Sequence, residues 1–425
     1  MKKRSPYKVA PVKSLDARPL VEDVEDQRVI VGIDVAKEKM VAAVVDEGDA
    51  VLKIVGWSHP IETAGFVELV RALAGSAADV AVAMEPSGVY GDALRWQLIE
   101  AGFEVHRVSP KKSYDASEIY DGVPSSHDGK SSAIVAWLHG QGKSEPWPVR
   151  TERERGLTAL LRVLEVHSKQ FRQNRNRLEG FVARHWPELT RYLDLDKATL
   201  LELLLAYGGP AAVAANLGQA RELMLRVGGA ALGREKVEAV LESAQHTVGM
   251  PQVAEEVAMV QAIAAEARRN QKSERAARGR VEELSAAEGS TKEMQAVVGK
   301  TTAAVVVAAA GDPLNYESPQ AFQKSLGLNL KERSSGKKVG ALRITKRGSG
   351  TARMFLYMAS LRLIQSDETV RAWYTKKVAR DGGSQKIKAV VAVSRKLTLA
   401  LWHVARGEEF DSSKLFDRRR LGLSS

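Results

Sequence analysis

The stretch RVIVGIDVAKEKMVAAVVDEGDAVLKIVGW, residues 28–57, decides the fold of the first part of the chain. It contains three runs rich in Val, Ile and Ala, and short polar turns at residues 37–39 and 47–49 separate them. Runs of β-branched residues bounded by such turns predict strands, and strands so close in sequence usually pair with their neighbours. We therefore expect an antiparallel meander of three strands here.

Helical and strand patterns alternate after the meander. A polar segment rich in Ser, Asp and Gly, residues 109–129, is predicted to be a loop that leads into a last helix. Meander, helix, strand, helix, strand is the order of an RNase H-like (RuvC-like) α/β domain, which we expect over residues 28–150. The predicted elements between the meander and the loop are a helix at 62–73, a strand at 79–85, a helix at 91–101 and a strand at 103–108.

The rest of the chain is predicted to be helical. A heptad pattern within residues 151–290 fits either a dimerising coiled coil or an intramolecular helical hairpin, and the pattern does not separate the two. Residues 291–410 indicate a compact, mostly α-helical domain with one conspicuous basic loop, while residues 1–27 and 411–425 are predicted to be flexible basic tails. The heptad positions are Leu157, Leu161, Leu164, Phe171, Leu178 and Val182.

Composition narrows the classes of function. The chain has 425 residues, of which 63 are Lys or Arg and 52 are Asp or Glu, so its formal charge of +11 favours nucleic acid as a partner. It contains no Cys, which excludes disulfides, thiolate metal sites and cysteine nucleophiles. Neither a signal-peptide core nor an apolar run of about 20 residues is present, so we expect a cytoplasmic protein without a membrane partner.

Two carboxylates stand at the ends of strongly apolar runs. Asp34 ends VIVGID and Glu85 ends VAVAME. A carboxylate at the end of a buried strand is costly unless it is paired or bound to a cation, and carboxylate oxygens suit Mg²⁺. Either carboxylate alone could cap the following helix or pair with a Lys, but the two together favour a metal site.

Asp128 precedes the last helix of the first domain, in SSHDGKSSAIVAWL. Asp is a good N-cap residue, so capping is one interpretation, and a third metal ligand is the other. His127 beside it could tune such a site, although a solvated loop His is the more ordinary interpretation. Asp115 and Asp121 in the preceding segment are weaker candidates.

A second group of candidates lies in LGLNLKERSSGKKVGALRITKRGSGTARMFLY, residues 326–357, where Glu332 is the only acid. Its Gly residues let backbone amides approach phosphates, so the stretch predicts a clamp for a nucleic-acid backbone rather than a solvated basic loop. Ser334 and Ser335 lie within this field, and either is a possible nucleophile, although Ser beside Gly is also common in turns. The cations are Lys331, Arg333, Lys337, Lys338, Arg343, Lys346, Arg347 and Arg353.

The two groups together resemble the transposases of the insertion sequence 110 family, which are related to the Piv DNA invertases. The resemblance rests on GIDVAKEKMVAAVVD, on MEPSGVYGDALRWQLIEAGFEVHRVSP, on an Asp before a helix, and on GLNLKERSSGKKVGALRITKRGSGTARMFLYMAS, and it extends over residues 28–408. In that family a RuvC-like domain carries a DEDD set of acids, and the C-terminal transposase domain carries a serine next to Gly.

The resemblance implies roles for individual residues. Asp34, Glu85 and Asp128 match the first three acids, which act in catalysis and bind Mg²⁺. Ser335, directly before a Gly, matches the nucleophilic serine, with Ser334 as the alternative. The fourth acid is expected three residues after Asp128, where this sequence has Ser131.

The implied function is a DNA transposase or site-specific recombinase that cleaves and rejoins donor and target DNA through a serine nucleophile, with Mg²⁺ assisting. Family members use a structured non-coding guide (bridge) RNA and form homodimers or homotetramers, and such an enzyme would work at the bacterial nucleoid. Two alternatives stay open. One is a metal-only RuvC-like nuclease, and the other is a nucleic-acid-binding descendant of a transposase, catalytically impaired by Ser131.

Overall fold

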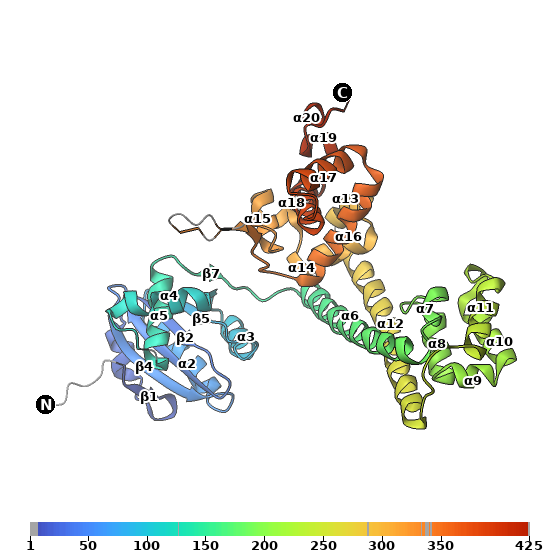
Figure 1. Ribbon diagram of the computed structural model, residues 1–425. Helices are drawn as coiled ribbons and strands as arrows, with labels where there is room; N and C mark the ends of the chain where they lie inside the picture. Colours follow the sequence, from blue (N-terminus) through green and yellow to red (C-terminus); the bar gives the residue numbers. More distant parts are fainter. Residues whose placement is uncertain are drawn as a thin grey trace. The chain divides into compact units, whose positions relative to one another are not determined.

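The chain divides into two compact units, Met1–Arg150 and Thr151–Ser425, which are described separately. Figure 1 shows the computed structural model. Within its described ranges, every helix is too short or too polar to span a bilayer. The described residues are 7–125, 127–286, 289–332, 334–335, 340 and 342–423.

The first unit is built on a mixed sheet of seven strands in the order β1-β4-β3-β2-β5-β6-β7. The predicted meander is confirmed, because β2, β3 and β4 pair antiparallel, while β5 and β6 continue the sheet in parallel from β2. This is the predicted RNase H-like arrangement. The strands are β1 (Val9–Pro11), β2 (Arg28–Asp34), β3 (Lys39–Asp46), β4 (Val51–Ser58), β5 (Asp79–Glu85), β6 (Val105–Arg107) and β7 (Glu145–Pro146).

Helices cover both faces of this sheet (Figure 1). On one face, α1, α2 and α3 enclose a core in which the Trp57 ring stacks on Phe66 with 3.8 Å between ring centroids. On the other face, α5 packs across β2 and β3, with α4 beside it. The helices are α1 (Arg18–Asp23), α2 (Thr63–Ala74), α3 (Asp92–Glu100), α4 (Pro110–Asp121) and α5 (Asp128–Gly140).

Two predictions about the first unit were wrong. The polar segment predicted as a loop contains the helix α4, which starts at Pro110, a residue well suited to the first helical turn. The predicted N-terminal tail is structured from residue 7 onward, because β1 adds to the edge of the sheet beside β4, and Leu20 of α1 and the C-cap residue Val24 are buried. A strand of three residues is too short to reveal its period in the sequence.

In the second unit, two long helices form an antiparallel pair, α6 (Glu152–His185) and α12 (Ala254–Ser285). As the residue number rises along α6, the residue that it contacts on α12 has a lower number. Arg153 Nε donates to Leu284 O at 2.9 Å, and His167 Nδ1 lies 2.9 Å from Asn270 Oδ1 further along. The heptad residues of α6 are buried or half-buried inside this chain, so the structure has the intramolecular hairpin of the two predicted arrangements.

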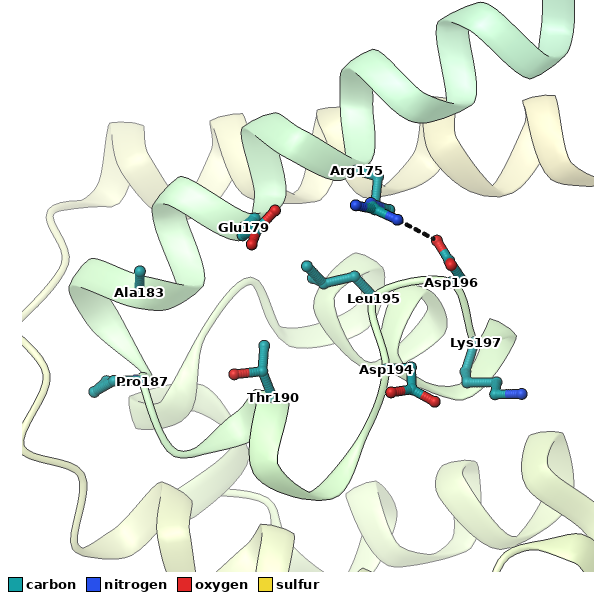
Figure 2. Close-up of a pocket in the computed structure, with 9 residues that line it drawn as sticks. All are labelled: Arg175, Glu179, Ala183, Pro187, Thr190, Asp194, Leu195, Asp196 and Lys197. Carbon is teal, nitrogen blue, oxygen red and sulfur yellow. Dashed lines mark hydrogen bonds and ion pairs between the residues drawn. The ribbon is translucent and has the colours of Figure 1, made fainter. Parts of the chain in front are cut away.

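A cluster of short helices lies between α6 and α12 (Figure 1). Figure 2 shows a pocket of about 510 Å³ beside α6, where Arg175 and Asp196 form an ion pair of 3.5 Å. None of the predicted site residues lines it. The cluster comprises α7 (Leu189–Tyr192), α8 (Ala198–Tyr207), α9 (Pro210–Ala214), α10 (Leu217–Gly228) and α11 (Arg234–Gln245).

The C-terminal part packs around α14, which is buried from Thr302 to Ala308. The predicted loose tail is wrong for residues 412–421, because they form two short helices and Phe416 packs against Trp373 with 4.8 Å between ring centroids. Its elements are α13 (Gly289–Val298), α14 (Lys300–Ala310), α15 (Pro319–Ser325), β8 (Leu330–Lys331), β9 (Arg343–Ile344), α16 (Gly350–Ser366), α17 (Glu368–Arg380), α18 (Lys386–Val404), α19 (Ser412–Leu415) and α20 (Arg418–Leu421).

Candidate functional site

Asp34 and Glu85 lie side by side at the carboxyl ends of two parallel strands. They are the last register pair of β2 and β5. The residues before them, Ile33 and Met84, are fully buried, whereas Asp34 and Glu85 are half-buried at the carboxyl ends of the strands. The sheet thus brings together two acids that are 51 positions apart in the sequence (85 − 34).

Gly32 places the helix that carries the third acid. A Cβ atom at Gly32 would lie 2.4 Å from the backbone N of Ala136 and 2.4 Å from the O of Ser132. Only a residue without a side chain allows α5 to approach β2 this closely. The first residue of α5 is Asp128, so the glycine two positions before Asp34 also fixes the position of Asp128.

Asp128 does not cap its own helix. The N-cap residue of α5 is His127, whose Nδ1 accepts a hydrogen bond from the Lys130 backbone N–H at 3.1 Å. The His127 ring also meets the edge of Tyr7, with 5.0 Å between centroids. Since His127 takes the capping role, the exposed carboxylate of Asp128 is available for another one.

The acids act on one another electrostatically. The pKa of Asp34 is raised from its ordinary value near 3.8 to about 6, mainly by burial and in addition by the negative charges of Glu85 and Asp128. Among the described residues, no cationic side chain offsets this effect on Asp34. In the described ranges, the side chains of His, Asp and Glu form no group of three that could hold a metal ion.

A buried lysine in the first turn of α5, Lys130, was not predicted. The Lys130 side chain is 1% exposed, and its Nζ lies 2.6 Å from Asp121 Oδ1. Asp121 also accepts a hydrogen bond of 3.1 Å from the Tyr7 hydroxyl, and its pKa is lowered mainly by the hydrogen bond from Lys130. This network ties the end of α4 and the N-terminal segment to the start of α5.

The weaker acidic candidates are occupied by other partners. Asp121 belongs to the Lys130 network, and Asp115 pairs with Lys111 at 2.5 Å, one helical turn away. Ser131, at the position of the fourth acid, is half-buried in the first turn of α5. A hydroxyl there brings no negative charge to the acidic site.

The basic stretch forms a hairpin in which β8 pairs antiparallel with β9. Its base is fixed by Asn329, which accepts hydrogen bonds from the Thr345 backbone at 2.9 Å and the Thr345 hydroxyl at 2.5 Å. Gly327 has φ of +69°, and a Cβ atom there would lie 2.2 Å from Arg347 O, so the two chain segments touch backbone to backbone. The hairpin is therefore anchored at its base.

The two serines of the hairpin differ in their hydrogen bonds. The Ser334 hydroxyl donates to the Glu332 carboxylate and accepts from the Gly340 N–H at 2.9 Å. Ser335 is exposed, and its hydroxyl makes no hydrogen bond to a described residue. The structure therefore leaves the Ser335 oxygen accessible and the Ser334 oxygen engaged.

The predicted backbone-binding cations fall into three groups. Arg353 is half-buried, and its Nη1 donates to the carbonyls of Leu326 and Gly348, both at 3.1 Å, so it supports the hairpin base. Burial lowers its pKa. Exposed side chains belong to Lys331, Arg343, Lys346 and Arg347, whereas Arg333, Lys337 and Lys338 lie outside the described residues.

Comparison with known protein families gives two matches. Residues 31–187 match a model described as a transposase, of the DEDD type found in IS110 elements. Residues 295–375 match a model described as the transposase IS116/IS110/IS902 family. No curated protein matches the chain. The first match contains all three acids, and the second contains the basic hairpin.

Proposed function

We propose that this chain, which belongs to the IS110 family of transposases, recombines DNA with two sets of residues, the acids of its first unit and a hairpin serine of its second. The observation that carries the proposal is the pairing of Asp34 with Glu85 at the carboxyl ends of β2 and β5, where burial, followed by the charges of Glu85 and Asp128, raises the pKa of Asp34 to about 6. Uncompensated carboxylates of this kind are typical of sites that bind a cation.

Mg²⁺ is the cation that fits this donor set best. Asp34 and Glu85 would hold it directly, and Asp128 would reach it through water, since Mg²⁺ usually keeps several of its waters. When bound, it would neutralise negative charge on the scissile phosphate. Among the described residues, these three side chains do not form a closed metal-binding group, and a partly hydrated ion does not require one.

Ser335 is the proposed nucleophile. Its hydroxyl oxygen would attack the phosphorus of a DNA phosphodiester, the bond to one deoxyribose oxygen would break, and that oxygen would take up a proton as the serine loses one. Attack on the phosphoserine by a deoxyribose hydroxyl of a second strand would then rejoin DNA and restore the serine. The Ser335 side chain is exposed and the Ser334 hydroxyl is engaged by Glu332 and Gly340, which supports this choice over Ser334.

The partners are proposed from the family and from charge. The substrate is DNA, donor and target, and we propose that a structured guide RNA directs their choice and that the enzyme assembles as a dimer or tetramer at the nucleoid. A formal charge of +11 supports contact with long polyanions but does not distinguish DNA from RNA.

The test is a junction assay in cells that carry the coding region with its own flanking DNA. We expect an excised circular junction with the wild type, and its loss in Ser335→Ala and in Asp34→Asn, while both variants still bind DNA. Deleting the non-coding flank separately tests the guide RNA. A junction formed by Ser335→Ala would assign the nucleophile elsewhere, and a metal-only nuclease would tolerate that change.

A second candidate function is binding without recombination. Ser131 in place of an acid favours it, together with the absence of a three-residue metal-binding group among the described side chains. In that case the wild type would bind DNA but form no junction, and Ser131→Asp would gain Mg²⁺-dependent activity. Junction formation by the wild type would exclude it.

A further inference from the structure

We propose that the turn between α17 and α18 is a second DNA-backbone contact, separate from the basic hairpin, in which Arg380, Lys386 and Lys388 bind phosphates. The inference rests on DNA being the substrate. Neither family match extends beyond residue 375, so these three residues lie outside both of them.

The charge of this segment is strongly one-sided. Residues 371–396 contain eight cations and one acid, Asp381. Such an excess within 26 residues (396 − 371 + 1) exceeds that of the chain as a whole, which has 63 cations for 52 acids. The cations are Arg371, Lys376, Lys377, Arg380, Lys386, Lys388, Arg395 and Lys396.

Asp381 gathers three of these cations at one place. Its carboxylate lies 2.8 Å from Lys377 Nζ, 3.6 Å from Arg380 Nε and 3.9 Å from Lys388 Nζ. Lys377 and Asp381 are largely buried as the closest pair, whereas the Arg380 and Lys388 side chains are 72% and 58% exposed. One negative charge therefore faces three positive ones, and the excess charge is on the two exposed residues.

The two lysines lie where a helix disfavours them. Lys386 and Lys388 are in the first turn of α18, which contains no acid, and the N-cap residue Gln385 makes no side-chain hydrogen bond to the helix. Cations at the positive end of a helix are unfavourable, so stability alone does not account for this placement. An external anion would compensate both the lysines and the helix end.

One residue of the proposed contact, Lys388, lies on the same face of α18 as a residue that contacts the hairpin base. Lys388 and Arg395 are seven residues apart, which places them on one helix face about 10 Å from each other. Arg395 Nε donates to Leu328 O at 2.8 Å, next to the start of the hairpin. A duplex bound at Lys388 is therefore within reach of the hairpin base.

The test compares two triple variants of the full chain that remove equal charge. One is Arg380→Gln, Lys386→Gln and Lys388→Gln, and the control is Arg226→Gln, Arg234→Gln and Lys236→Gln, at exposed positions of the middle helices. Affinity for a duplex DNA and for a structured RNA of similar length is measured by fluorescence anisotropy at several salt concentrations. Both variants have a formal charge of +8 (11 − 3).

We expect the first variant to weaken DNA binding and to lower the slope of log K against log salt by about 2 to 3, at about 0.9 per phosphate contact. The control should change that slope by less than 1. A charge-conserving variant, Lys386→Arg with Lys388→Arg, should keep the wild-type slope. Equal slopes in the two triple variants, or a loss confined to RNA, would overturn the proposal. A wild type that binds no DNA would instead overturn the DNA-dependent function itself.

Discussion

Asp34 and Glu85 are register partners at the carboxyl ends of the parallel strands β2 and β5. Burial is the main cost of ionising Asp34, and the negative charge of Glu85 adds to that cost. The pair therefore lowers the stability of the ligand-free protein, and we expect this cost to be recovered when a cation binds.

The first prediction concerns Asp34→Asn. A carboxyl whose pKa is raised by folding binds its proton more tightly in the folded state, so its unfavourable effect on stability grows as the pH rises from about 4 to above 6. Because one pKa unit corresponds to about 1.4 kcal/mol and partial exposure screens part of the effect, the variant should gain about 2 kcal/mol at pH 8.

Urea unfolding at pH 8 and pH 5, with a chelator present, measures this gain. The gain should be smaller at pH 5, and Mg²⁺ should stabilise the wild type more than Asp34→Asn. A variant that is less stable than the wild type at pH 8 would mean that Asp34 is not under electrostatic strain.

Gly32→Ala should separate the helix of Asp128 from the sheet. The added methyl group would meet backbone atoms of α5 at 2.4 Å, so either β2 or α5 must move, at a cost of about 2 to 3 kcal/mol. Gly180→Ala is a matched control, because its Cβ atom meets nothing within 4 Å on an exposed helix position. The control should instead gain up to about 1 kcal/mol. Thermal unfolding of the two variants decides between them.

Lys130→Met tests the buried network. It leaves Asp121 without its 2.6 Å partner, and we expect a loss of about 2 to 3 kcal/mol, less than for a fully buried pair because Asp121 is 26% exposed. In a double-mutant cycle with Asp121→Asn, the two losses should overlap by at least about 1 kcal/mol. Simple additivity of the two losses would show that the ion pair does not stabilise the start of α5.

The sequence predicts the sheet well and the short elements poorly. The strands that end at Asp34 and Glu85 are long apolar runs between turns, so their pairing follows from the pattern. The helix α4 has few apolar residues, and β1 is stabilised by pairing with β4 rather than by its own period. Elements of this kind depend on contacts with distant parts of the chain, which a local sequence pattern does not show.

The sequence predicts which acids belong to the candidate site but not the contacts that surround them. Asp34, Glu85 and Asp128 stand out by their places in the sequence, whereas the burial of Lys130 depends on a partner across a loop. That His127 rather than Asp128 caps α5 was likewise decided by local geometry. The unusual glycine within an apolar strand, Gly32, was the one available sign of the close approach of α5.

Ser131→Asp probes the missing fourth acid. A carboxylate in the first turn of α5 adds a negative charge near the other three, so Mg²⁺ should bind more tightly, and the stability without metal should fall. Titration of Mg²⁺ followed by thermal unfolding measures both effects. Ser132→Asp is no substitute control, since Ser132 is fully buried, and Ser131→Asn serves instead. Equal Mg²⁺ responses in the Asp and Asn variants would place residue 131 outside the metal site.

The most direct test of the central claim is a search for a covalent protein–DNA adduct. Wild type, Ser335→Ala and Ser334→Ala are incubated with donor DNA, the non-coding RNA and Mg²⁺, then denatured and separated by size. Mass spectrometry maps any phosphorylated serine. The account predicts an adduct at Ser335 that persists in Ser334→Ala and disappears in Ser335→Ala. DNA strand exchange without an adduct, or an adduct that survives in Ser335→Ala, would contradict it.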